Sequence, residues 1–154
     1  MVFRKIDRSN YWECMELTVD DSQKDFVADN KQSLVEAAYE ENLYTLGIYC
    51  QDTMVGFILY DYDDQIPGWS MSRFMIGKQY QGKGYGKRLM EYARDKKHMD
   101  KVDVNEQNEK ALSFYLHMGF QIIGRDETDG MGKPYPILHL QLKEATVEKS
   151  KSKG

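Results

Sequence analysis

Cysteine and proline are scarce in this sequence of 154 residues, which holds two cysteines and three prolines. Cys14 and Cys50 form no motif, so we expect two reduced thiols in a cytoplasmic protein rather than a disulfide framework. No run approaches the ~20 apolar residues of a membrane span, and residues 1–7 lack the apolar core of a secretory signal. The net charge of −4 lacks the basic excess that is usual for a nucleic-acid partner.

The sequence that is present is typical of a globular domain, with 41% hydrophobic and 30% charged residues. No repeat, linker or change of composition interrupts residues 1–142, so we expect a single domain there. Residues 143–154 are polar and rich in lysine, and they are expected to form a disordered tail.

Hydrophobic periodicity and turn residues predict alternating elements. Strands are expected at 2–6, 43–50, 54–62, 69–76, 101–104, 120–125 and 135–142. Helices are expected after a cap at Ser9, from Asn30 or Ser33, after a glycine-rich loop at 81–86, and at 108–118. Strands without a helix between them favour antiparallel pairing, and an intervening helix permits parallel pairing. The predicted fold class is α/β (α+β), with a mixed, largely antiparallel central sheet flanked by helices.

The segment that is most informative about function is a predicted strand followed by a glycine-rich loop and then by the start of a helix. Its strand ends in Phe74-Met75-Ile76, and its loop is Gln81-Gly82-Lys83-Gly84-Tyr85-Gly86-Lys87. Glycine lets the backbone approach a ligand closely, and free N–H groups at a helix start attract an anion. A diphosphate fits this description, whereas the spacing matches neither the ATPase P-loop nor the dinucleotide fingerprint. The alternative interpretation is three ordinary turn glycines.

A second segment, residues 105–120, predicts a strand end, a helix and a glycine at the helix C-terminus. Gly119 suits the position just after the helix. Asn108 can cap the helix or hydrogen-bond a ligand amide, and Tyr115 can be a core aromatic residue instead of a functional one.

The two segments together carry a resemblance. The pattern Gln81-x-x-Gly84-x-Gly86, followed by Asn108-x-x-Ala111-x-x-x-Tyr115-x-x-x-Gly119-Phe120, resembles the GNAT family of acetyl-CoA-dependent N-acetyltransferases. Within that family, residues 3–90 resemble bacterial spermine/spermidine (polyamine) acetyltransferases, through residues 24–30, 52–57 and 73–87. Residues 105–142 look more like a different bacterial branch of the family.

The resemblance implies the GNAT acyl-CoA N-acyltransferase fold, acetyl-CoA as co-substrate and a small-molecule amine as partner. The implied reaction moves an acetyl group to a primary amine of a small cationic acceptor, with a polyamine as the leading choice, by direct attack in a ternary complex. Alternatives are a protein or peptide amine, an aminoglycoside, or a non-catalytic CoA-binding module, which a short helix after the loop would favour. A homodimer is also common in such families.

The resemblance also implies residue roles. The strand residues Phe74, Met75 and Ile76 would pair with the pantetheine arm through their backbone, and the Ile76 N–H would be the oxyanion donor. Asn108 would bond the pantetheine region, and Tyr115 would give a proton to the departing CoA thiolate. The diphosphate would be held by the loop residues Gln81, Gly82, Lys83, Gly84, Tyr85, Gly86 and Lys87.

The acceptor site and the general base stay open at this level. Candidate bases are acidic, and the run 61–64 can either attract a polycation or form a solvated turn. His139 is interpreted as an ordinary core or surface histidine, and no His/Cys spacing indicates a metal site. The candidate bases are Glu16, Glu40, Glu41, Asp61, Asp63 and Asp64; all but Glu40 form the predicted substrate-binding set.

Overall fold

The computed structural model describes residues 1–24, 28–63, 67–129 and 132–143. These residues form a seven-stranded sheet of order β1-β2-β3-β4-β5-β7-β6, in which β4 and β5 run parallel and every other neighbouring pair runs antiparallel. The predicted mixed, largely antiparallel sheet is thereby confirmed. Along the chain the elements are β1 (Val2–Lys5), α1 (Tyr11–Glu16), α2 (Asn30–Tyr39), β2 (Tyr44–Cys50), β3 (Thr53–Asp63), β4 (Gly68–Ile76), α3 (Tyr85–Lys97), β5 (Met99–Asn105), α4 (Glu109–His117), β6 (Phe120–Asp126) and β7 (Ile137–Leu142).

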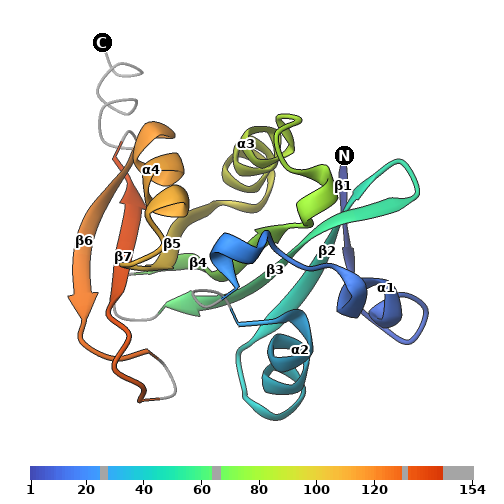
Figure 1. Cartoon of the computed structure of the whole chain (residues 1–154), viewed down its shortest axis with the longest axis horizontal. Coiled ribbons are helices and arrows are strands. Elements are labelled where there is room, and N and C mark those ends of the chain that lie inside the picture. The colour runs from blue at the N-terminus through green and yellow to red at the C-terminus, as the bar shows by residue number, and fades with distance from the viewer. Residues whose placement is uncertain (25–27, 64–66, 130–131, 144–154) are drawn as a thin grey trace.

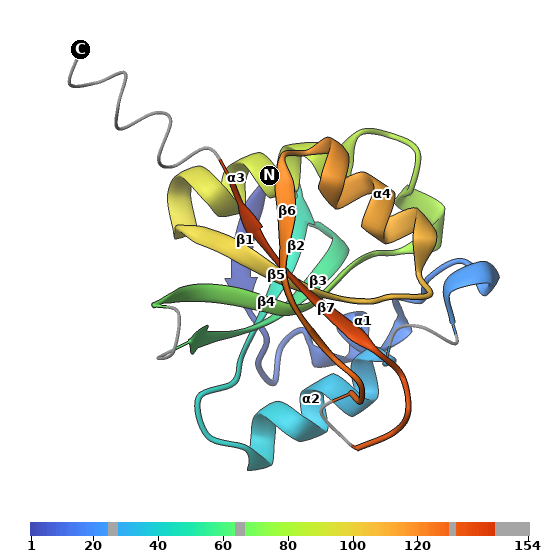
Figure 2. The ribbon, with the colours of Figure 1, turned by 90° about the vertical axis from the view of Figure 1, so that its left-hand side faces the viewer.

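The sheet lies between two layers of helices. Helices α3 and α4 cover one face, and α1 and α2 cover the other (Figures 1 and 2). The larger apolar cluster includes Ile58, Met71 and Leu89, whereas the smaller one contains Cys14 and Phe57. In the part of the chain that the structure describes, both faces of the central strands are therefore covered by apolar packing.

The cap of α1 differs from the expected Ser9, whereas α2 begins at Asn30, one of the two expected positions. Helix α1 begins after Asn10, because the Ser9 hydroxyl donates to Asp7 at 2.6 Å instead of capping the helix. In α2 the cap is Asp29, whose carboxylate accepts from the backbone N–H of Gln32 at 2.8 Å. This frees the buried Asn30 side chain to donate to the carbonyl of Cys14 at 2.9 Å, which ties α2 to α1.

The elements around the second motif follow the prediction closely. The Asn108 side chain caps α4 by accepting from the N–H of Ala111 at 3.3 Å. Gly119 follows the helix with a φ of 102°, which favours glycine. Strand β5 extends beyond the expected 101–104, to Met99 at one end and Asn105 at the other, and its polar residues Lys101 and Asn105 are buried. Helix α3 spans 13 residues and is not short.

The sheet opens between its two parallel strands. Pairing of β4 with β5 ends at Met71 opposite Val102, although β4 continues to Ile76 and β5 to Asn105. On its other side β4 stays paired with β3 up to Ile76 opposite Gly56. The final residues of β4 therefore present one bonded edge to β3 and one open edge to the gap. Among the described residues, no helix is long and apolar enough to cross a membrane.

Candidate active site

A cavity of about 1040 Å³ lies where β4 and β5 part. Three groups of residues line it: the strand ends with α4, the segment from α1 to α2, and the connection between β6 and β7. From the first group come Phe74, Met75, Asp103, Val104, Asn105, Asn108, Ala111 and Tyr115. Three of the sequence-predicted donor-site residues and the predicted acid Tyr115 thus meet in one space.

The open edge of β4 carries backbone groups directed into the gap. The N–H of Gly77 donates to the carbonyl of Val55 at 2.9 Å, which makes these two residues a hydrogen-bonded pair. In an antiparallel ladder the next pair exchanges no hydrogen bonds, so the N–H and carbonyl of Ile76 face away from β3. The Gln81 side chain donates to that carbonyl at 2.9 Å, which leaves the Ile76 N–H for a ligand.

The same alternation separates Phe74 from Met75. Phe74 shares the parity of Ile76, so its backbone groups also face the gap, whereas those of Met75 face Phe57 on β3. Met75 instead contributes its side chain to the cavity lining. Backbone pairing with a ligand is therefore available at Phe74 and Ile76.

The glycine-rich loop has the conformation that an anion site needs. Gly82 and Gly84 have φ values of 77° and 81°, and a β-carbon at either position would meet no atom within 4 Å. Gly84 is the N-cap of α3 and offers no side-chain cap, so the first N–H groups of the helix are free of one. The exposed side chains of Lys83 and Lys87 flank this start. The arrangement fits a diphosphate.

Tyr115 combines deep burial with a free hydroxyl. Its side chain is 4% exposed, and its ring packs against Phe114 and Phe120 at centroid distances of 5.5 and 5.6 Å. No described residue hydrogen-bonds the hydroxyl, although the residue lines the cavity. Burial, and next the charge of Asp103, raise the pKa of Tyr115, so the phenol stays protonated at neutral pH and is a weaker acid than a free tyrosine.

The predicted carboxylates are dispersed. Glu16 lines the cavity, and Glu41 does not. Asp61 is on β3 and accepts from the hydroxyl of Ser72, a lining residue, at 3.2 Å. Asp63 ends β3, and Asp64 lies outside the described residues.

Four other carboxylates line the cavity, and none of them is in the predicted substrate-binding set: Asp29, Glu36, Asp103 and Asp129. Only Asp103 had a recognisable signal in the sequence, because it alternates with the buried residues Val102 and Val104 along a strand. Glu36 is held by Arg73 of β4 in a two-pronged ion pair, with N–O distances of 3.0 and 3.2 Å.

Asp103 also belongs to a cluster that spans three strands. His139 of β7 contacts Asp103 of β5 through Nδ1 and Asp126 of β6 through Nε2, each at 2.7 Å. The pKa of His139 is raised to about 9, chiefly by the hydrogen bond to Asp103. The hydrogen bond to Asp126 adds to this effect, and desolvation opposes it. His139 is therefore a charged partner of a cavity residue rather than an ordinary core or surface histidine.

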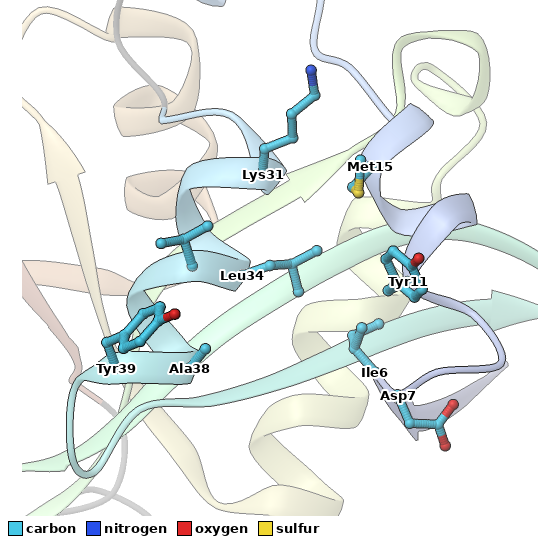
Figure 3. A pocket seen from close by; sticks show the side chains of 9 residues that line it. Ile6, Asp7, Tyr11, Met15, Lys31, Leu34, Ala38 and Tyr39 are labelled. Carbon is cyan, nitrogen blue, oxygen red and sulfur yellow. The ribbon is translucent and has the colours of Figure 1, made fainter.

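A smaller groove of about 470 Å³ lies between α1 and α2 (Figure 3). Its wall is largely apolar, with Ile6, Leu34 and Ala38 among the lining side chains. Met15 and Lys31 border both this groove and the large cavity. The groove has no proton donor paired with a cavity carboxylate, so the chemistry belongs to the large cavity. Among the described residues no group of three His, Cys, Asp or Glu side chains could hold a metal ion.

Comparison with known proteins agrees with this geometry. The model of the acetyltransferase (GNAT) domain family matches residues 15–132. The chain belongs to the GNAT family. It is 36% identical over 124 residues to the peptidyl-lysine N-acetyltransferase YjaB of Salmonella typhimurium, covering 78% of this chain and 81% of that protein. It is 27% identical over 129 residues to the spermine/spermidine N(1)-acetyltransferase of Bacillus subtilis, covering 75% and 84%.

The fold agrees as well. The solution structure of YjaB in its apo form from Escherichia coli superposes with a TM-score of 0.65 at 28% identity, covering 91% of this chain and 95% of that one. The GNAT protein described here is therefore an acetyl-CoA-dependent N-acetyltransferase, as its resemblance implied. Similarity to polyamine acetyltransferases exists, but it is lower than the similarity to YjaB.

Proposed function

We propose that this GNAT enzyme acetylates a lysine ε-amine presented by a peptide or protein. The observation that carries this choice is the balance of charge around the cavity. Among the described residues, five lining carboxylates, Glu16, Asp29, Glu36, Asp103 and Asp129, are accompanied by four cations, Lys24, Lys31, Arg73 and Lys133. A polyamine carries several positive charges and is best complemented by a pocket lined mainly with carboxylates. A single lysine on a polar peptide backbone is complemented by a pocket that has both acidic and basic side chains. The greater identity to a peptidyl-lysine acetyltransferase supports the same choice.

The donor half of the site is proposed to work through backbone groups. Phe74 and Ile76 would pair with the pantetheine arm along the open edge of β4. The Ile76 N–H would hydrogen-bond the thioester oxygen, and such a donor is typically worth about 3 kcal/mol. The free amides at the start of α3, with Lys83 and Lys87, would hold the diphosphate. Asn108 already caps α4 with its Oδ1, so its amide group is what remains for the pantetheine region.

Tyr115 is proposed to protonate the departing sulfur. The phenol is neutral and holds a proton for the departing thiolate, whose ordinary pKa is about 8.5, although the raised pKa of Tyr115 itself opposes the transfer. Attack is proposed to be direct in a ternary complex. Neither Cys14 nor Cys50 is among the residues that line the cavity, and burial raises the pKa of Cys14 to about 12, so no acyl-cysteine is expected.

A polyamine remains the second candidate, because Glu16 and Asp103 line the cavity without a lysine or arginine partner among the described ion pairs. The test measures release of free CoA thiol with acetyl-CoA and an N-terminally blocked lysine peptide. The same peptide with arginine in place of lysine is the matched control, and spermidine and an aminoglycoside are the competitors. We expect the highest kcat/KM with the lysine peptide and none with its arginine counterpart. A higher kcat/KM with spermidine would replace the proposal, and no turnover with any amine would favour a CoA-binding module.

A further inference from the structure

Asp103 is a carboxylate that lines the same cavity as Tyr115, and its Oδ1 is hydrogen-bonded by His139. We propose that Asp103 receives the ammonium group of the acceptor and takes its proton, and that His139, fixed by Asp126, is the positioning residue that aims Asp103. This inference rests on the proposed function, because it assigns residues to the acceptor side of the same site.

Strand pairing explains why the three side chains meet. Asp103 lies opposite His139 in the register of β5 and β7, so the two side chains project from the same face of the sheet. A register shift between Ile122 and Gly124 sets Gly124 opposite His139, and no side chain of β6 stands directly over the ring at that position. Asp126, two residues further along, can then reach Nε2 at 2.7 Å.

The contacts of Asp103 leave one oxygen available. Its Oδ1 accepts from His139, and no described residue hydrogen-bonds its Oδ2. The side chain is 31% exposed, and the residue lines the cavity, so the free oxygen has access to a ligand there. Tyr115 lines the same cavity. A proton acceptor and a proton donor therefore border the same space.

The charges of the cluster suit an ammonium ion. With a carboxylate at each ring nitrogen, His139 must donate from both, which is the imidazolium form. The charged groups that contact the ring among the described residues are Asp103 of β5 and Asp126 of β6. Two carboxylates and one imidazolium leave a net charge of −1 at the cavity wall.

The other lining carboxylates are engaged elsewhere. Arg73 binds both oxygens of Glu36, Asp29 caps α2, and Asp129 accepts from the backbone N–H of Lys133 in its own turn. Glu16 is the competitor, since it lines the cavity from the end of α1. The experiment must therefore separate Asp103 from Glu16.

The proton balance of the proposed step is complete. One N–H bond of the ammonium breaks as an O–H bond forms on Oδ2 of Asp103, and the freed electron pair attacks the thioester carbonyl carbon. The C–S bond breaks, and sulfur takes the phenol proton of Tyr115. The second proton lost by the amine nitrogen restores Tyr115, and Asp103 returns its proton to water. One proton is thus released per acetyl group transferred.

The test compares the wild type with Asp103→Asn, His139→Gln and Glu16→Gln at saturating acetyl-CoA with the lysine peptide. We expect Asp103→Asn to lower kcat about 100-fold or more, the usual contribution of a general base. We expect His139→Gln to lower it about tenfold, as for one lost hydrogen bond between charged groups. The matched control is Glu127→Gln, which removes a neighbouring exposed carboxylate that pairs with Arg125, and it should leave kcat unchanged. All variants should bind acetyl-CoA as the wild type does.

A second acceptor separates catalysis from structure. In the probe peptide an aminooxy group replaces the lysine ε-ammonium. This group is already neutral at pH 7, so no base is needed to deprotonate it before it attacks. Asp103→Asn and the wild type should acetylate this peptide at comparable rates. Equal losses on both peptides would make Asp103 a structural residue, and a loss confined to Glu16→Gln would make Glu16 the base; either result overturns the inference.

Folding and substrate choice are controlled separately. Thermal unfolding is measured for each variant, and Asp103→Glu, which keeps the carboxylate, should recover part of kcat if Asp103→Asn is unstable; no recovery in a folded Asp103→Glu overturns the inference. A wild type that acetylates only spermidine would refute the proposed peptide acceptor. The same variants are then assayed with spermidine, and an unchanged kcat in Asp103→Asn would refute the role of Asp103 independently.

Discussion

Replacing Gly84 by alanine is expected to weaken acetyl-CoA binding much more than it weakens the fold. Gly84 has a φ of 81°, and the left-handed conformation costs an alanine about 1–2 kcal/mol. The lower entropy of the unfolded chain offsets about 0.4–1 kcal/mol of this cost. The free energy of unfolding should therefore fall by about 1 kcal/mol, which lowers Tm by roughly 2–4 °C in a chain of this length.

The effect on the ligand arises from where the added methyl group stands. A β-carbon at Gly84 meets no protein atom within 4 Å, so it occupies open space at the start of α3, where the diphosphate is proposed to lie. Each charge-assisted hydrogen bond lost there costs about 1.5–3 kcal/mol. The dissociation constant of acetyl-CoA should consequently rise at least about tenfold, as measured by titration calorimetry.

Gly132→Ala is the matched control. Gly132 has a φ of 78°, its β-carbon would also meet nothing within 4 Å, and it lies between β6 and β7, away from the loop. We expect the same small loss of Tm with an unchanged dissociation constant. If both variants bind acetyl-CoA equally well, the anion site is not at the start of α3 and the reasoning fails.

Three further predictions follow from single side chains. Tyr115→Phe should lower kcat about 100-fold or more with an unchanged dissociation constant for acetyl-CoA, and an unchanged kcat would exclude Tyr115 as the acid. Because the folded-state pKa of His139, about 9, lies above its ordinary 6.5, its stabilisation is complete below about pH 6.5 and is lost as the pH rises to about 9. For a side chain 35% exposed, screening reduces this to about 1–2 kcal/mol; urea unfolding should show the loss in the wild type and not in His139→Gln. Cys14, whose burial raises its pKa to about 12, should resist a thiol reagent in the native protein while the more exposed Cys50 reacts; rapid labelling of both would contradict this.

The segments proposed for the donor side could be located from the sequence because the residues of each are contiguous. The loop 81–87 and the helix that contains Asn108 and Tyr115 each keep their spacing within one short segment. Which backbone groups of 74–76 face the gap could not be predicted, because that parity depends on the bond between Gly77 and Val55 of another strand. Composition also hid the full length of β5, since the residues added to the expected strand include the polar Asp100 and Asn105, and Asn105 is buried.

The acceptor side that we propose is assembled from separate segments, and this explains why the acidic run 61–64 was the more visible candidate in the sequence. A run of charges is conspicuous in a sequence, yet of its described members only Asp61 contacts a cavity residue, through Ser72. Asp103, His139 and Asp126 are far apart in the chain and meet because β7 lies between β5 and β6. That strand order reverses the order of the last two strands in the sequence. Each of the three strands contributes one side chain to this cluster, and residues so far apart in the sequence form no local pattern. The cluster could therefore be recognised only from the register of the strands.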